Sequence, residues 1–240
     1  MIFLLFILAT AAGAFIQTTT GFGFGILVMI FYPQLLPGVI MSVTVSGMLS
    51  LQTNVVTMLR YFRHIAWKKL LWPMLCYAVV SFAAIRFSMG QGDALMKRLL
   101  GVMLILLSIW FLFFGKRVRI RPTPAAGLAA GALSGLFSGL FSIGGPPIVV
   151  YLLSSAESNE EYMATTQTYF TITSIYALTV RALSGLVTLE SLKFAVLGIL
   201  GVAAGVFLGR RVFRKLNADR LRMAVYIFMA VAGVSLLAGL

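Results

Sequence analysis

Two glycine-rich stretches contain the residues best suited to bind a ligand. The first covers residues 17–25, with the sequence QTTTGFGFG, and the second covers residues 142–147, with the sequence SIGGPP. Ser138 precedes the second stretch by one helical turn. Closely spaced glycines and paired prolines interrupt a helix, and the free N–H groups at the start of the following helix attract anions. Because the hydroxyl and amide side chains nearby add further donors, both stretches are candidate anion-binding sites.

Side chains that could perform acid–base, metal or nucleotide chemistry are scarce. The chain has one histidine, His64, and one cysteine, Cys76, and no carboxylate lies in the middle of an apolar segment. The sequence also lacks a GxxxxGK[ST] phosphate-binding loop. We therefore predict that the chain is not an enzyme and needs neither a cofactor nor a metal. Since proton relays and cation pathways in membranes use carboxylates, their scarcity favours an anionic solute.

The composition indicates a membrane protein. Of the 240 residues, 60% are hydrophobic and 10% are charged, and the mean hydropathy is +1.01. A soluble domain has about 25% charged residues, and it could not bury this much apolar surface in one small core. The net charge of +13 comes from basic residues in short connections. This pattern favours contact with the headgroups of a lipid bilayer and argues against binding of nucleic acid.

Eight apolar segments alternate with short polar connections. The first has no Lys or Arg before it, which favours a membrane segment over a signal peptide. The segments cover residues 2–32, 38–59, 70–89, 95–114, 123–153, 162–184, 189–209 and 220–239. If all eight crossed the membrane, ten Lys and Arg residues of the connections would lie on one side of it and nine on the other. If the fifth segment enters and leaves the membrane on the same side, fourteen of these basic residues lie on one side and five on the other. The positive-inside rule favours this second arrangement.

The chain also resembles two copies of one unit. The interruption at residues 21–25 has a counterpart about 120 residues later, at residues 142–147. We predict an all-α integral membrane protein with two repeats of four hydrophobic segments, residues 1–115 and 125–240, joined by a basic linker, residues 116–124. Each repeat would begin with a broken, re-entrant segment, and the three crossings that follow would invert the second repeat. Matched interruptions in two halves are the best indicator in a sequence of a transporter's binding site.

Polar residues in other segments add to the candidate site, although each also has a purely structural interpretation. Gln52, Thr166 and Gln167 either line the solute path or hold helices together. Arg181 either attracts anions or extends to the membrane interface. Glycines that recur every fourth residue, at 127–139 and 201–209, predict helix-packing faces instead. The candidate substrate-binding residues are Gln17, Thr18, Thr19, Thr20, Gly21, Gly23, Gly25, Gln52, Ser138, Ser142, Gly144, Gly145, Pro146, Thr166, Gln167 and Arg181.

Both stretches resemble the signatures of a known family. Residues 15–25 (FIQTTTGFGFG) are similar to the first-half signature of the TauE/SafE sulfite exporter family of membrane permeases, and residues 135–147 (GLFSGLFSIGGPP) to its second-half signature. Residues 60–67 resemble the basic turn and tryptophan that follow the family's second segment. The chain departs from the family in two places, because family members often have glycine at the position of Thr20 and near Ser142. The resemblance implies secondary transport of small anions, notably sulfite, sulfonates and related sulfur compounds, with the two stretches forming the central site.

The residues and the resemblance together predict a multi-pass permease of the cell inner (plasma) membrane. Its substrate would be a small anion, such as sulfite, an organosulfonate or a related sulfur oxyanion. The alternatives are a passive anion channel and a non-transporting membrane subunit that binds a partner. The sequence leaves open which anion is carried, in which direction, with which coupled ion, and whether the chain forms a homo-oligomer.

Overall fold

The computed structural model describes residues 1–113, 121–212 and 218–238, and the regular structure within these ranges is entirely helical. The all-α prediction is therefore confirmed for the described residues. The α-helices are α1 (Ile2–Thr20), α2 (Phe24–Leu35), α3 (Val39–Tyr61), α4 (Trp67–Met89), α5 (Asp93–Phe113), α6 (Pro124–Phe141), α7 (Gly145–Ser155), α8 (Asn159–Leu183), α9 (Leu189–Val212) and α10 (Ala218–Ala238). A short 3-10 helix, η1 (Phe62–His64), lies between α3 and α4. Of the predicted basic linker, only residues 121–124 are described.

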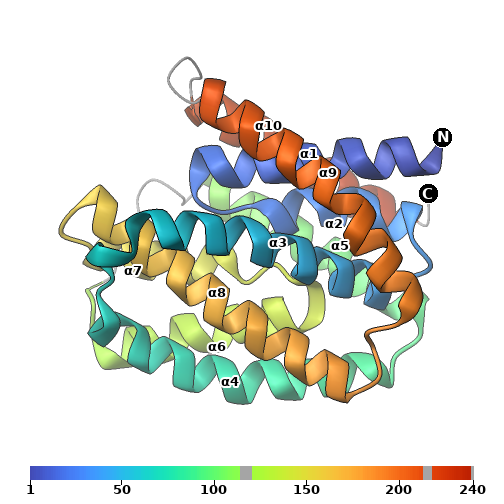
Figure 1. Ribbon diagram of the computed structural model, residues 1–240. Helices are drawn as coiled ribbons and strands as arrows, with labels where there is room; N and C mark the ends of the chain where they lie inside the picture. Colours follow the sequence, from blue (N-terminus) through green and yellow to red (C-terminus); the bar gives the residue numbers. More distant parts are fainter. Residues whose placement is uncertain (114–120, 213–217, 239–240) are drawn as a thin grey trace.

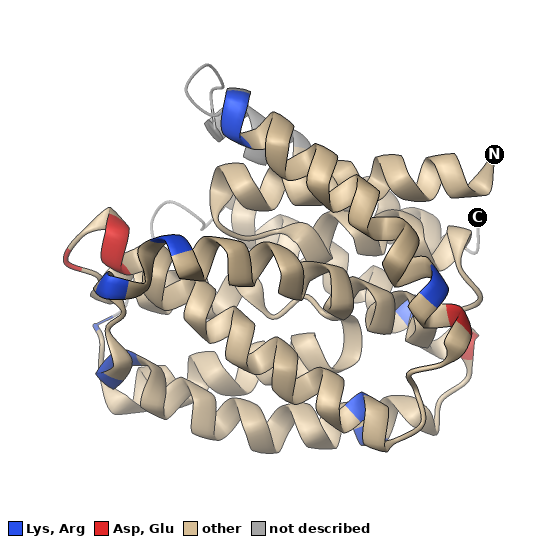
Figure 2. Cartoon of the chain, in the orientation of Figure 1, with Lys and Arg blue, Asp and Glu red and all other residues tan. Residues whose placement is uncertain are grey.

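Within the described residues, six helices are long and apolar enough to cross a membrane, namely α1, α3, α4, α5, α6 and α9. Large apolar side chains on their outer faces are exposed, for example Val79 on α4 and Leu106 on α5. Figure 2 shows the charged residues gathered at the two ends of the helix bundle, with an uncharged band between them. Because charges are unfavourable in hydrocarbon, this distribution suits a bundle that spans a bilayer.

The first and fifth apolar segments, which the sequence predicted to be interrupted, each form two antiparallel helices. α2 folds back along α1, so that the hydroxyls of Thr10 and Tyr32 lie 2.7 Å apart. α7 folds back along α6, where Ser134 Oγ donates a hydrogen bond of 2.7 Å to the carbonyl oxygen of Gly144. The eight predicted segments thus correspond to ten helices within the part of the chain that is described.

Left-handed backbone conformations produce the two reversals. In the first, Gly21 ends α1 with a φ of 82° and Gly23 begins α2 with a φ of 105°. Glycine adopts these angles without steric strain. In the second, Ser142 ends α6 with a φ of 59°, the one positive φ at a non-glycine position among the described residues. Both interruptions therefore begin with a residue in the left-handed conformation, which is a glycine in the first and a serine in the second.

Glycine faces on α6 and α9 bring pairs of helices into backbone contact, as their four-residue spacing predicted. A Cβ at Gly131 of α6 would lie 2.1 Å from the carbonyl oxygen of Pro73 in α4. A Cβ at Gly205 of α9 would lie 2.2 Å from the carbonyl oxygen of Ala11 in α1. Small residues let membrane helices pack this closely without help from the hydrophobic effect. The α4–α6 and α1–α9 pairs are the most extensive helix contacts in the described structure.

Two further pairs, α3 with α8 and α5 with α10, complete the bundle. Consecutive helices alternate in direction, so that α3, α5, α7 and α9 end at the left of Figure 1 while α4, α8 and α10 end at the right. The basic residues in the last turns of α3 and α9 are therefore at the left end. Several basic residues counted for the topology prediction lie outside the described residues, namely Lys116, Arg117, Arg119, Arg214 and Lys215.

Candidate functional site

A small cavity lies where the two interrupted segments meet. Its volume is about 50 Å³, which gives room for roughly three or four water molecules or one small ion. Side chains and backbone of α1, α2, α3, α4, α6, α7 and α8 enclose it, so both halves of the chain contribute. The predicted site residues that line it are Gln17, Gly23, Gly25, Ser138, Ser142, Gly144 and Gly145.

The two interruptions are in direct contact. Gly25, in the first turn of α2, lies so close to Ser142 that an added Cβ would be 2.1 Å from the Ser142 carbonyl oxygen. A Cβ at Gly145, in the first turn of α7, would lie 3.6 Å from the Cβ of Phe22. The N-termini of α2 and α7 therefore border the same space. Each helix N-terminus carries about half a positive charge, so the two together favour an anion between them.

Gln17 of α1 fixes the start of α2. Its side-chain oxygen accepts a hydrogen bond of 3.1 Å from the N–H of Phe24, and its Nε2 donates to Oδ1 of Asn54 on α3. The next two N–H groups, of Gly25 and Ile26, belong to residues that line the cavity. Because the first turn of a helix has no carbonyls to accept its N–H groups, these two remain available to a ligand.

Three serines at four-residue intervals form the opposite wall. Ser134, Ser138 and Ser142 share one face of α6 and its C-terminal end, and all three line the cavity. The hydroxyl of Ser138 lies 2.9 Å from the hydroxyl of Tyr77 on α4, and Ser134 bonds to Gly144 as described above. These contacts orient the hydroxyls of Ser134 and Ser138. Because Ser134 donates its proton to Gly144, the serine hydroxyls that can donate to a ligand are those of Ser138 and Ser142.

The start of α7 offers fewer N–H donors than the sequence suggested. Its second and third residues, Pro146 and Pro147, have no N–H group. Gly145 is therefore the one N–H donor among the first three residues of α7. Pro146 faces away from the cavity, into an apolar groove between α5 and α6.

The predicted threonines and glycine next to the first interruption make structural contacts. Thr18 and Thr19 donate to carbonyl oxygens of their own helix, α1, and Thr18 also packs against Gly209. Thr20 Oγ1 lies 2.6 Å from the carbonyl oxygen of Phe22. The carbonyl oxygen of Gly21 accepts a hydrogen bond of 2.6 Å from Nε2 of Gln167 on α8. These residues support the turn and do not line the cavity.

The remaining predicted residues also lie outside the cavity lining. Gln52 faces a separate groove between α3 and α9, beside Arg210 and Arg211. Thr166 is fully buried within α8. Arg181 is buried near the end of α8, where its Nη2 donates a hydrogen bond of 2.5 Å to the carbonyl oxygen of Gly139.

Several lining residues were not among the predicted site residues. They are Phe22, Ile26, Ser50, Asn54, Tyr77, Ser134, Ile143, Phe170, Thr173 and Ser174. Helical spacing could have indicated Ser134, one turn before Ser138, and Ser50, one turn before Asn54. No comparable signal marks Tyr77 or Thr173, because the packing of α4 and α8 brings them to the cavity.

The lining combines N–H, hydroxyl and amide groups with a few apolar walls. None of the lining side chains in the described structure is charged. The described residues also contain no cluster of three or more His, Cys, Asp or Glu that could hold a metal ion. The cavity is therefore rich in hydrogen-bond donors and suits a small, polar solute.

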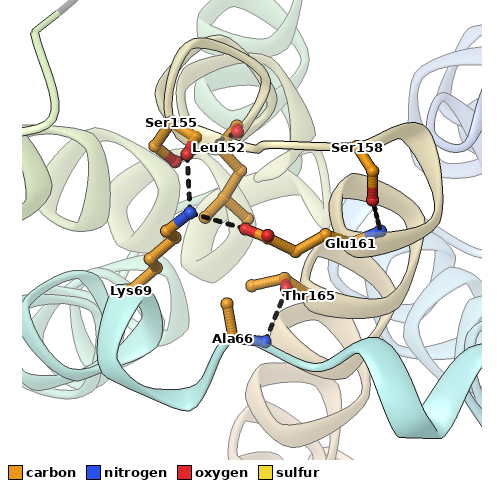
Figure 3. A network of polar contacts seen from close by, with 7 residues as sticks. All are labelled: Ala66, Lys69, Leu152, Ser155, Ser158, Glu161 and Thr165. Carbon is orange, nitrogen blue, oxygen red and sulfur yellow. Dashed lines mark hydrogen bonds and ion pairs between the residues drawn. The ribbon is translucent and has the colours of Figure 1, made fainter.

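Lys69, in the first turn of α4, joins the two halves of the chain (Figure 3). Its Nζ lies 2.6 Å from Oε1 of Glu161 on α8 and 2.6 Å from the carbonyl oxygen of Ser155, the last residue of α7. Beside it, the N–H of Ala66 donates a hydrogen bond of 3.0 Å to Oγ1 of Thr165. The Lys69 and Glu161 side chains are 26% and 16% exposed, so the pair is partly shielded from solvent. These contacts tie the start of α4 to the connection between α7 and α8.

Comparison with known proteins gives one match. A family model described as "Sulfite exporter TauE/SafE" matches residues 5–236, which is nearly the whole chain. No curated protein and no solved structure matches the chain.

Proposed function

The chain belongs to the sulfite exporter TauE/SafE family, and we propose that it is a secondary transporter that carries a small sulfur oxyanion, such as sulfite, across the cell inner (plasma) membrane. The observation that carries this proposal is the contact of the two interrupted segments, which brings the N-termini of α2 and α7 to one cavity. Helix N-termini in discontinuous membrane helices are a common way to hold anionic groups of a substrate.

In this proposal the anion lies between Gly25 and Gly145. The N–H groups of Gly25, Ile26 and Gly145 donate to its oxygens, and the hydroxyls of Ser138 and Ser142 complete the shell. A cavity of about 50 Å³ favours a compact oxyanion over a long organosulfonate. The serines and N–H groups also match the hydrogen-bond acceptors that sulfite presents on all its oxygens.

We further propose that the chain is an inverted repeat of two five-helix units, α1–α5 and α6–α10, each of which begins with a re-entrant hairpin. The pairing of helices supports this. The first helix of each unit packs on the fourth helix of the other, in the pairs α1–α9 and α6–α4. The third helices pair with each other, as do the fifth helices. A two-fold axis in the membrane plane relates units in this way, since a re-entrant hairpin followed by three crossings leaves the chain on the opposite side of the membrane.

The cytoplasmic side is assigned by the basic residues. The last turns of α3 and α9, which carry Arg60 and Arg211, and the first turn of α4, which carries Lys69, lie at the left end of the bundle in Figure 1. By the positive-inside rule, this end faces the cytoplasm. The Lys69–Glu161 pair then lies at the cytoplasmic end of the bundle, and we propose that it opens when the solute passes to that side.

Transport assays in proteoliposomes test the function. The expected result is saturable counterflow of radiolabelled sulfite, with competition by related sulfur oxyanions. Gly145→Leu, whose long side chain would enter the cavity, should abolish this flux while the protein still inserts and folds. Current that does not saturate would indicate a channel, and the absence of any flux by the wild-type protein would indicate a membrane subunit without transport activity.

A further inference from the structure

Arg181 is a buried charge that the proposed site does not contact. Its side chain is 3% exposed, although it belongs to the last turn of α8. A guanidinium has five N–H donors, yet its side chain makes one hydrogen bond within the described structure, to the Gly139 carbonyl oxygen. The ion pairs found among the described residues do not include Arg181. A buried charge with so little compensation is strongly unfavourable, which calls for a further source of negative charge.

The cavity is a space that could supply this charge. Gly139 directly follows Ser138, which lines the cavity. Tyr77 also lines the cavity, and its hydroxyl contacts that of Ser138. Along α8, Arg181 comes two turns after Ser174, another lining residue, and therefore about 10 Å further along the same face. Side chains of a helix lean toward its N-terminus, which for Arg181 is the direction of the cavity.

We propose that Arg181 sets the charge selectivity of the cavity. Its fixed positive charge stands beside the site without touching the solute, so it favours anions over neutral solutes and dianions over monoanions. The cavity lining is uncharged, and its residues are buried or half-buried, so salt screens this attraction less than it does between exposed charges. The inference rests on the proposed function, because it requires an anion in the cavity. The competing explanation is purely structural, namely that Arg181 only neutralises the negative C-terminal end of α6.

The size of the effect depends on the charge of the solute, which separates the two explanations. With an effective dielectric constant of about 20 and a separation of about 10 Å, loss of one positive charge weakens binding of a monoanion roughly fifteenfold and of a dianion roughly 200-fold. A structural role would weaken the binding of both equally. Sulfite provides both charge states in one molecule, since it is a monoanion in mildly acid solution and a dianion in mildly alkaline solution.

The experiment measures sulfite binding by calorimetry in detergent at pH about 6 and about 8.5. It compares the wild-type protein with Arg181→Gln and with Arg86→Gln, which removes the same charge from an exposed arginine in the last turn of α4, at the same end of the bundle. We expect Arg181→Gln to lose roughly tenfold more affinity at the higher pH than at the lower, and Arg86→Gln to bind like the wild type at both. Arg181→Met, which keeps the aliphatic stem, replaces the Gln variant if that variant does not fold.

Two results would overturn the proposal, and they are distinguishable. If the wild type binds sulfite and the Arg181 variant loses the same factor at both pH values, Arg181 is a structural residue and the proposed function stands. If the wild type binds no sulfite at either pH, the proposed function fails and the inference fails with it.

Discussion

Gly25→Ala is the sharpest perturbation of the contact between the two interrupted segments. The added Cβ would lie 2.1 Å from the carbonyl oxygen of Ser142, whereas ordinary contacts of a Cβ begin at 3.4 Å. The backbones of α2 and of the second interruption must therefore separate by about 1 Å. Overpacking of this kind costs about 1–3 kcal/mol. Alanine also favours helix more than glycine by about 1 kcal/mol, so the net loss of folding stability is about 0–2 kcal/mol.

The effect of Gly25→Ala on transport should exceed its effect on stability. The separation moves the N–H groups of Gly25 and Ile26 away from those of α7, so that one small anion no longer contacts both helix N-termini. A loss of 1–3 kcal/mol in anion binding corresponds to a decrease of roughly 5-fold to 150-fold in affinity. We expect sulfite counterflow in proteoliposomes to fall by roughly fivefold or more, while the melting temperature falls by only a few degrees.

Two other glycines provide matched controls for this substitution. At Gly145 the nearest atoms to an added Cβ are 3.6 Å away, and at Gly92 no atom lies within 4 Å. Alanine should therefore be tolerated at both positions, even though Gly145 lines the cavity. If Gly25→Ala transports sulfite as fast as Gly145→Ala and Gly92→Ala, the contact between the interruptions is not needed and the proposed site is refuted.

Three further substitutions test other parts of the structure. Gln17→Glu replaces the amide between Phe24 and Asn54 with a carboxylate of nearly the same shape. Its negative charge should lower the sulfite affinity measured by calorimetry at least tenfold. Unchanged affinity would mean that the anion binds elsewhere. Lys69→Met removes a partly shielded ion pair worth about 1 kcal/mol. The cavity should then be easier to reach from the cytoplasmic side. The measurement is thiol labelling from that side of the variant Ser50→Cys, made in a Cys76→Ser background, and labelling should increase. The double variant Lys69→Glu, Glu161→Lys exchanges the two charges and should restore the wild-type labelling. If it does not, the ion pair does not control access to the cavity. Gly131→Ala should lower the stability by about 1–3 kcal/mol in thermal melting, because its Cβ would lie 2.1 Å from the Pro73 carbonyl oxygen, and an unchanged melting temperature would contradict the close packing of α4 and α6.

The helices and their membrane environment were predictable because they depend on local composition. Long apolar segments can only be helical in lipid, since every backbone N–H and carbonyl must be paired within the segment. The glycine faces of α6 and α9 were predictable for a similar reason, because a four-residue period defines one side of a helix. The two interruptions were visible as glycines and prolines, which change the backbone wherever they stand.

Which polar residues surround the cavity was less predictable. Gln17 and Ser138 belong to it, but Thr18 and Thr19 point elsewhere, because successive residues of a helix face different sides. Gln52 and Asn54 are two residues apart on α3, and only Asn54 reaches the cavity. The sequence contains no information on the rotation of α3 about its axis, which is set by its packing against α8.

The sequence by itself therefore determined an all-α membrane protein, two matched interruptions and the family to which they point. These features follow from the residue types and their spacing along the chain. Only the tertiary structure decided that Gly25 touches Ser142, that Tyr77 and Thr173 complete the wall, and that Arg181 is buried beside the cavity without lining it. Contacts between residues this distant in the chain arise from the way whole helices pack, and packing depends on all of their surfaces at once.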